Sequence, residues 1–321
     1  MAGPSDPARF WFSTHDSRLD HYEADWRRYQ ALFGQLAAIK AGLDAYVGLF
    51  DATLGQDYGF IEAGILKQVP GLDPGRFAAP PPGTRLAIEQ GEYVALPHVQ
   101  ASFPLIAQAL APCIDDSVDC IVEFGSGIGT NLARLRLRHP GRDITYIACE
   151  PTEIGRATTA MLFAADPAMR TRVLHFDYTV ADLDFLKDYH RPVAFTNHSI
   201  EQVATVGAPF YARLLRSPVA ACAHLEPVGW QRYDNVRAVV LAMYRDPAFF
   251  KATLDRHGWS LDDARLIDNA AMWAARHAYN VDLLPTVAAA AKADAVTLTA
   301  LAYDVTGLNP FNPSTLIAWR R

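Results

Sequence analysis

The amino-acid sequence predicts an α/β protein in which a doubly wound, mostly parallel sheet is closed by a C-terminal antiparallel β-hairpin and preceded by an N-terminal helical cap. From Cys120 onward, short apolar runs alternate with segments of helical spacing, the pattern of consecutive βα units. A glycine-rich turn, Gly125–Gly129, directly follows the first of these runs. Only Asp304–Pro313 separates the last two apolar runs, which is too short for a helical crossover, so these two strands should pair antiparallel.

The N-terminal part of the chain is predicted to be mainly helical. Tyr22–Ile39 and Leu43–Phe50 carry aromatic residues and leucines at helical spacing, with charged residues between them. Val69–Thr84 is rich in proline and glycine and is expected to be a loop or an extended connector. Glu92–Leu110 should form a short approach segment followed by a helix.

The remainder of the chain is predicted to form the sheet and the helices that cover it. We therefore expect a helical cap or oligomerisation region over residues 1–115 and a second domain over residues 116–321. The predicted strands are Cys120–Phe124, Ile144–Cys149, Arg172–Phe176, Pro192–Thr196, Ala220–Leu225, Ala295–Tyr303 and Ser314–Arg320. The predicted helices are Asn131–Arg138, Ile154–Ala165, Ala181–Tyr189, Pro209–Arg216, Gln231–His257 and Ala270–Ala293.

Composition excludes several classes of protein. The chain has 321 residues, a formal net charge of −6 and 20% charged residues, so it lacks the basic balance that nucleic-acid binding requires. The four cysteines form no CxxC pair, Met1–Phe12 has no signal-peptide core, and no apolar run approaches the roughly 18 residues of a membrane span. We expect a cytoplasmic protein that binds neither nucleic acid nor a membrane.

The glycine-rich turn has the features of a nucleotide-cofactor loop. Glycines at 125, 127 and 129 allow a tight turn and a close approach of the backbone to a ligand, and the following helix offers free N–H groups. Glu150 ends the next predicted strand, where an acid can accept hydrogen bonds from ribose hydroxyls of NAD or of S-adenosylmethionine (SAM). Thr130 breaks the dinucleotide fingerprint GxGxxG/A, and an additional acid, Glu123, precedes the glycines, which together favour SAM over NAD.

The segment Glu123–Gly129 (EFGSGIG) resembles motif I of class I SAM-dependent methyltransferases, and Glu150 resembles their ribose-binding acid. The resemblance implies the class I fold, five βα units closed by a hairpin, with SAM as cofactor. It implies that Glu123 serves the SAM ammonium group directly or through water, and that Asp177 meets the adenine amino group, with Phe176 or Tyr178 against the ring. The cofactor-binding set is then Tyr93, Glu123, Gly125, Ser126, Gly127, Gly129, Asn131, Glu150, Pro151, Asp177, Tyr178, Asn197 and His198.

The ends of the fourth and fifth predicted strands carry the candidate catalytic residues. Asn197 and His198 follow the fourth strand, and His224 and Glu226 end the fifth, so all four should lie at the open edge of the sheet. His198 is the first choice for a general base, oriented by Glu201 or Glu226. His224 also fits a structural histidine. The spacing of these groups supports no metal site.

The leading functional hypothesis is methyl transfer to an oxygen or nitrogen atom of a small molecule, such as a specialised metabolite. A second hypothesis is a peptide or protein methyltransferase in which an acidic rim of Glu201 and Glu226 holds a cationic side chain. A third is a non-catalytic SAM-fold binding protein. The N-terminal helices and Trp273–Leu284 are the candidates for covering the pocket. The aromatic-rich helices over Phe10–Tyr29 could instead pack in the core or form a homodimer interface.

Overall fold

The computed structural model describes residues 15–53, 84–90, 92–97, 102–180, 182–246, 270–271, 273–275, 277–307 and 312–321. The connector predicted over residues 69–83 lies outside these ranges. Within them the chain forms nine strands and the helices around them. The strands are β1 Thr84–Glu89, β2 Glu92–Pro97, β3 Cys120–Phe124, β4 Thr145–Glu150, β5 Arg170–His175, β6 Pro192–Asn197, β7 Ala221–Glu226, β8 Thr297–Gly307 and β9 Ser314–Arg320.

All nine strands form one sheet in the order β2-β1-β8-β9-β7-β6-β3-β4-β5. Strands β3 to β7 are parallel to one another, and β9 pairs antiparallel with both β7 and β8. Counted from β3, the order across the sheet is 3-2-1-4-5-7-6, the class I methyltransferase arrangement. The predicted parallel sheet and its closing hairpin are thus confirmed.

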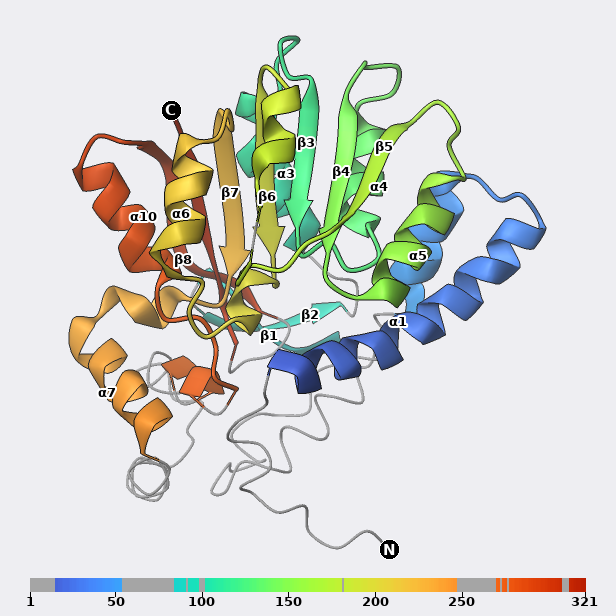
Figure 1. Cartoon of the computed structure of the whole chain (residues 1–321). Helices are drawn as coiled ribbons and strands as arrows, with labels where there is room; N and C mark the ends of the chain where they lie inside the picture. Colours follow the sequence, from blue (N-terminus) through green and yellow to red (C-terminus); the bar gives the residue numbers. More distant parts are fainter. Residues whose placement is uncertain are drawn as a thin grey trace, which may run out of the picture.

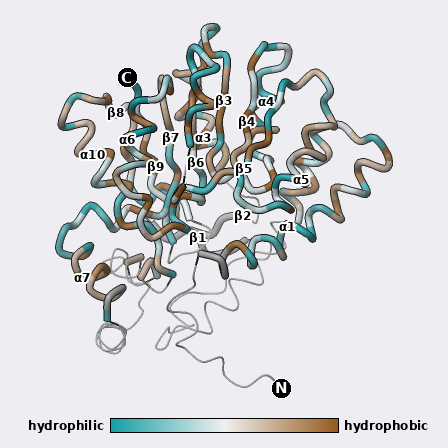
Figure 2. Tube along the Cα trace, viewed as in Figure 1, coloured by the Kyte–Doolittle hydropathy of each residue, from teal (hydrophilic) through white to brown (hydrophobic). Residues whose placement is uncertain are grey.

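The sheet is buried because each face has its own hydrophobic core. Successive residues of a strand point to opposite faces, so Ile121 of β3 packs with Leu132 on one side and Val122 packs with Phe210 on the other. Helices α3 (Ser102–Leu110) and α4 (Thr130–Arg138) lie on the first face, and α6 (Gly207–Arg216) and α10 (Leu283–Lys292) on the second (Figure 1). Hydrophobic residues recur along the central strands, and hydrophilic residues gather in the outer loops (Figure 2).

The N-terminal region contains strands as well as helices. Helix α1 (His15–Ala38) and a helix over residues 43–53 agree with the prediction, and α1 packs beside α5 (Glu153–Phe163). The hairpin of β1 and β2 was not predicted, and the expected approach segment before α3 is strand β2. These strands are short, and pairing of β1 with β8 at the edge of the sheet supplies the hydrogen bonds that local sequence patterns do not reveal.

Two predicted helices in the C-terminal half are divided. Instead of one helix over Ala270–Ala293, helical residues at 270–271 and 273–275 are followed by a turn and then by α10. The side-chain oxygen of Asn280 accepts hydrogen bonds from the N–H groups of Asp282 and Leu283, and this capping ends one segment and starts the next. The helix predicted from Gln231 is the 3-10 helix η5 (Gly229–Arg232) followed by α7 (Asp234–Arg245); its predicted end lies outside the described residues.

The segment predicted as a helix over Ala181–Tyr189 is the shorter 3-10 helix η3 (Asp184–Asp188).

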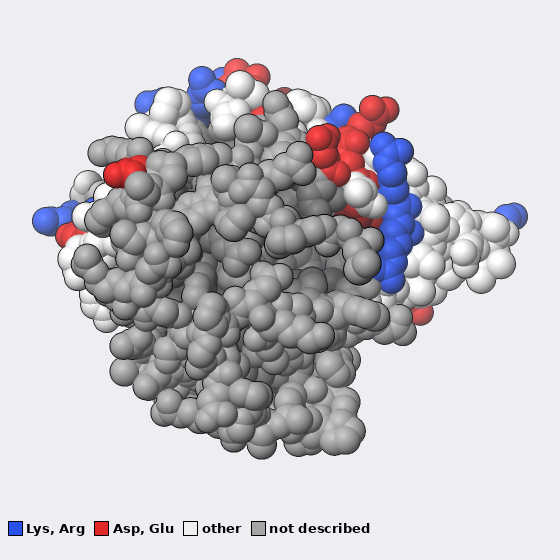
Figure 3. Space-filling view, turned by 90° about the horizontal axis from the view of Figure 1, so that it is seen from below, with Lys and Arg blue, Asp and Glu red and all other residues white. Residues whose placement is uncertain are grey.

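Viewed from the carboxyl ends of the parallel strands, acidic and basic side chains of the described residues lie next to one another (Figure 3). In the described part of the chain, no helix combines the length and the apolar character that crossing a membrane would require.

Candidate functional site

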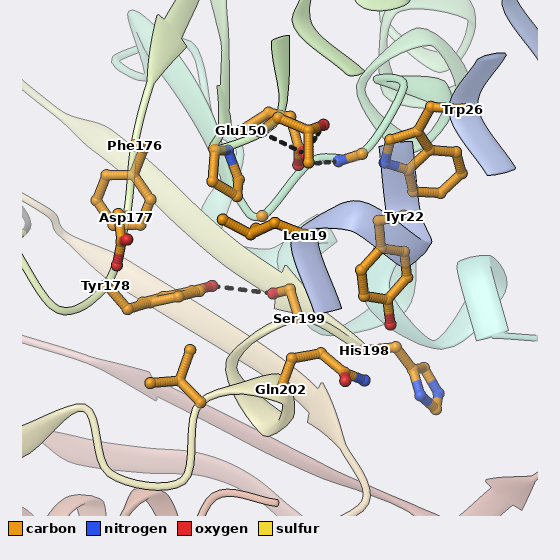
Figure 4. Close-up of a pocket in the computed structure, with 15 residues that line it drawn as sticks. Leu19, Tyr22, Trp26, Glu150, Phe176, Asp177, Tyr178, His198, Ser199 and Gln202 are labelled. Carbon is orange, nitrogen blue, oxygen red and sulfur yellow. Dashed lines mark hydrogen bonds between the residues drawn. The ribbon is translucent and has the colours of Figure 1, made fainter. Parts of the chain in front are cut away.

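A cavity lies at the carboxyl ends of the parallel strands, the edge of an open α/β sheet where ligands bind (Figure 4). It contains about 610 Å³ of space not filled by protein atoms, part of which is open solvent. The lining residues are Leu19, Tyr22, Trp26, Gly125, Gly127, Glu150, Pro151, Thr152, Phe176, Asp177, Tyr178, His198, Ser199, Gln202 and Val203.

The glycine loop between β3 and α4 forms one wall of this cavity. The N–H groups of Gly125 and Ser126 both donate to the carbonyl of Cys149, at 2.7 and 3.0 Å, which ties the loop to the end of β4. Gly125 has φ +69°, and a Cβ added there would lie 2.3 Å from Cβ of Ser199. Only glycine fits this position, because both the left-handed backbone and the neighbouring side chain exclude a larger residue.

Glu150 lines the cavity and also accepts a hydrogen bond from the glycine loop. Its Oε2 accepts a hydrogen bond from the Gly127 N–H at 2.9 Å, and its Oε1 accepts from the N–H and the hydroxyl of Thr152 at 3.1 and 2.5 Å. Burial raises the pKa of Glu150 to about 6, so the carboxylate is ionised at neutral pH. A carboxylate has about four acceptor positions, and Glu150 therefore keeps capacity for a ligand on the cavity wall.

Glu123 lies beneath the loop and does not line the cavity. It is 1% exposed, and its Oε1 accepts a hydrogen bond from the amide of Asn131 at 2.8 Å. Arg134 donates to the Asn131 side chain at 2.8 Å and pairs with Asp51 of the N-terminal region. Burial raises the pKa of Glu123 to about 8. The geometry therefore does not favour a direct contact between Glu123 and a ligand in this cavity. Glu123 instead supports the glycine loop from below, through Asn131.

The residues after β5 form the wall opposite the glycine loop. Asp177 lines the cavity, and its Oδ1 accepts hydrogen bonds from the N–H and the hydroxyl of Thr179, both at 2.7 Å. The Tyr178 hydroxyl donates to the carbonyl of Phe124 at 2.9 Å and lies 2.9 Å from the Ser199 hydroxyl (Figure 4). Phe176 packs edge-on against Tyr178, with ring centroids 5.1 Å apart. These contacts fix the shape of this wall.

His198 follows β6 and lines the cavity. Its Nδ1 lies 3.3 Å from Oε2 of Glu201, and its Nε2 lies 2.7 Å from Oγ of Ser314. The side chain is 32% exposed, and the backbone adopts φ +50°, a left-handed conformation that a non-glycine residue holds only where its surroundings enforce it. Burial lowers the pKa of His198, but the charges of Glu201 and Glu226 outweigh this, so the pKa is raised.

Glu201 and Glu226 do not form an exposed acidic rim, which corrects the expectation from sequence. They are 2% and 0% exposed, respectively. Both oxygens of Glu226 accept from the Ser199 N–H, at 3.2 and 3.1 Å, because the 3-10 helix η4 (Ile200–Gln202) turns back over the end of β7. Burial and the nearby Glu201 raise the pKa of Glu226 to about 8. The two acids therefore act on His198 from within the protein.

His224 lies inside the sheet and away from the cavity, which corrects its inclusion among the catalytic candidates. It is 1% exposed; its Nδ1 lies 3.0 Å from the Thr196 hydroxyl, and its Nε2 accepts from the Trp319 indole at 3.4 Å. Burial lowers the pKa of His224 to about 4. The ring is therefore neutral and structural, with both nitrogens engaged. Asn197 also lies outside the lining of the cavity, although its side-chain oxygen is buried without a partner among the described residues.

Helix α1 covers the cavity with aromatic residues that the sequence reasoning did not assign to the site. The rings of Tyr22 and Trp26 stack with centroids 5.8 Å apart, and the Trp26 ring lies so close to Gly127 that a Cβ there would come within 2.9 Å of it. Tyr29 and Phe33, one and two turns further along, are buried in the core. The helical spacing of these aromatics indicates one face of α1, but only the tertiary contact shows that its first part reaches the glycine loop.

The other predicted residues have these positions. Ser126 and Gly129 complete the loop, and Pro151 follows Glu150 on the cavity wall. The backbone of Tyr93 belongs to β2, and its side chain lies outside the described residues. The described part of Trp273–Leu284 packs in separate hydrophobic clusters and does not line the cavity. Among the described residues, no group of three or more potential ligands could hold a metal ion.

No protein-family profile and no curated protein matches the chain. Among solved structures, magnesium protoporphyrin IX methyltransferase from Synechocystis matches with a TM-score of 0.43 and 7% identity over 68% of this chain and 82% of its own. An O-methyltransferase family protein from Burkholderia thailandensis gives 0.40 and 14% over 68% and 56%. A mycolic acid cyclopropane synthase gives 0.41 and 12% over 69% and 84%. The fold class given above rests on the strand order of this chain and not on these distant similarities.

Proposed function

We propose that this protein is a SAM-dependent methyltransferase that transfers a methyl group to an oxygen or nitrogen atom of a small molecule. The observation that carries the proposal is one cavity, at the carboxyl ends of the strands, that brings Gly125, Gly127, Glu150 and Asp177 together with His198. The first four are groups suited to the cofactor, and the fifth is a group that can accept a proton. Methyl transfer to a protonated acceptor needs both in one place.

The residues around the cavity fit a polar cofactor. Among the described residues that line the cavity, Trp26 has a buried polar atom, Nε1, with no hydrogen-bond partner. Buried polar atoms in proteins are nearly always paired. The unpaired indole N–H therefore supports a ligand that brings a hydrogen-bond acceptor with it, and the two glycines leave the backbone open to approach.

Each element of the site has a role in this proposal. Glu150 would hold the ribose hydroxyls of SAM, Asp177 would hold its adenine amino group, and the Gly125–Gly127 backbone would hold its amino-acid part. When bound, SAM supplies an activated methyl group on its sulfonium sulfur. Glu123 keeps the loop in place through Asn131.

A compact acceptor fits the site because α1 covers part of the cavity. Leu19, Tyr22 and Trp26 line the side where a bare sheet edge would be open, which reduces the access of water to the reacting groups. A peptide methyltransferase would need exposed acids to hold a cationic side chain, whereas Glu201 and Glu226 are buried. The geometry therefore favours a small-molecule acceptor over a protein.

His198 is the proposed general base. With Nδ1 beside Glu201, the proton of a neutral ring belongs on Nδ1, which leaves Nε2 to accept the proton of the acceptor. A base works best when its pKa is close to the working pH, and the two buried acids raise the pKa of His198. Glu201 and Glu226 thus stabilise the imidazolium that proton transfer produces.

Replacing Glu150 with glutamine is expected to weaken binding of S-adenosylhomocysteine (SAH) by about 1.5–3 kcal/mol, roughly 10–100-fold, because charge-assisted hydrogen bonds are lost. Since protonation removes an acceptor from Glu150, SAH affinity of the native protein should fall as the pH drops through about 6, and the variant should lack this dependence. Calorimetric titrations between pH 5 and 8 measure both effects.

The control is Glu153→Gln, which removes the same charge from an exposed acid in the first turn of α5. It should bind SAH as the native protein does. If Glu150→Gln bound SAH as tightly as this control while melting at a lower temperature, Glu150 would support only the fold, and its role in ribose binding would be wrong.

A further inference from the structure

The hairpin that closes the sheet places a buried hydroxyl against the candidate base. Ser314 is the first residue of β9 and is 0% exposed, and its Oγ lies 2.7 Å from Nε2 of His198. The two residues come from distant parts of the chain and meet because β9 pairs with β7, next to β6. The proposed methyl transfer gives this hydroxyl no role, and the sequence placed it only at the start of the last predicted strand.

The contacts on the two ring nitrogens of His198 differ in quality. The Ser314 contact has the distance of a strong hydrogen bond. The Glu201 contact is longer, at 3.3 Å, and Oε2 of Glu201 has no partner that meets hydrogen-bond geometry among the described residues. Glu201 therefore contributes mainly charge, whereas the directional bond that fixes the plane of the ring comes from Ser314.

We propose that Ser314 is a positioning residue that sets the orientation of His198, whose tautomer is set by Glu201, an inference that rests on the proposed function. An ionised carboxylate only accepts, so Nδ1 beside Glu201 carries the ring proton, and Nε2 then accepts the O–H of Ser314. The Nε2 lone pair, which has to take the proton, is therefore held toward the Ser314 hydroxyl. During the reaction the O–H or N–H of the acceptor replaces Ser314 as that donor, the proton moves to Nε2, and no covalent bond to Ser314 forms.

The serine hydroxyl also suits both charge states of the ring. After proton transfer it can rotate and accept a hydrogen bond from Nε2–H, with Glu201 and Glu226 facing the imidazolium from η4 and β7. Tyr22 of α1 also lines the cavity (Figure 4). Bonds to a charged donor are about twice as strong as neutral ones. Loss of Ser314 should therefore cost the charged ring more than the neutral ring and lower the pKa of His198.

The test is ¹⁵N NMR of the histidine rings in the protein alone, for the native chain and for Ser314→Ala. The native His198 ring should be a single Nδ1–H tautomer in its neutral form. In Ser314→Ala the ring should keep this tautomer but have a lower pKa, and turnover should fall by roughly 10–100-fold, the scale on which misoriented catalytic groups act. The matched control is Thr315→Val, which removes the neighbouring, equally buried hydroxyl on the opposite side of β9.

The proposal is overturned if Ser314→Ala shows the same pKa for His198 as the native protein and Thr315→Val. The spectra need neither SAM nor an acceptor. A failure here therefore leaves SAH binding untouched, and a protein that does not bind SAH would refute the proposed function without altering the ring spectra.

Discussion

Replacing His198 with alanine is expected to slow methyl transfer by roughly 10²–10⁴-fold, the usual contribution of a positioned general base, while SAH affinity stays almost unchanged. The ring lines the cavity beside two buried acids, and its contacts to Glu201 and Ser314 are to the protein. A base must be neutral to accept a proton, and Glu201 and Glu226 raise the pKa of His198. The native rate should therefore fall on the acid side with a midpoint above the ordinary histidine value of about 6.5.

The measurement is SAH formation as a function of pH, with an acceptor identified by screening small phenols and amines for SAH release. His198→Asn is the informative second variant. Asparagine tolerates the left-handed backbone at this position, φ +50°, and can still donate or accept a hydrogen bond, but it cannot take the proton. Near-native turnover of His198→Asn with no acid limb would show that positioning alone drives the transfer, and that His198 is not the base.

Replacing Gly125 with alanine is expected to lower the free energy of unfolding by about 2–5 kcal/mol, from a left-handed backbone that costs about 1–2 kcal/mol and overpacking that costs about 1–3 kcal/mol. The new Cβ would meet Cβ of Ser199 at 2.3 Å, where no flexible chain end can yield. Relief of this overlap moves the loop or Ser199, so SAH affinity should fall by more than about tenfold. Chemical denaturation and SAH titration measure the two losses.

Gly141→Ala separates the two causes. Gly141 has φ +75°, close to that of Gly125, but a Cβ there would meet nothing within 4 Å. It should lose only the backbone part, about 1–2 kcal/mol, and bind SAH as before. If Gly125→Ala lost no more stability than Gly141→Ala, then the close approach of Ser199 to the glycine loop would not be a constraint on this site.

The central strands were predictable from the sequence because their signal is local. Cys120–Phe124 and Ser314–Arg320 have the predicted bounds, since a strand buried on both faces is a continuous apolar run with polar residues or turns at its ends. The hairpin of β1 and β2 was not predictable in this way, because its stability depends on the edge of β8, more than 200 residues away in the chain. The break at Asn280 depends on side-chain capping, which spacing of apolar residues does not reveal.

The site was predictable only where function requires a residue type at a strand end. Gly125, Glu150, Asp177 and His198 line the cavity as expected, because the carboxyl ends of parallel strands meet at one edge. Burial was not predictable: Glu226 ends β7 and His224 lies two residues before it, yet η4 covers Glu226 and His224 packs within the sheet. Trp26 and Ser314 reach the site from distant segments, and nothing in their local sequence indicates this.

Calorimetric titration of the intact protein with SAH tests the central claim most directly, because it depends on neither the acceptor nor the base. The glycine loop, Glu150 and Asp177 all face one cavity, and together they predict binding in the low micromolar range or tighter. The same titration with NAD should give no heat. A folded protein that released no heat with SAH and bound NAD instead would contradict the assignment of this cavity to SAM, and with it the proposed methyl transfer.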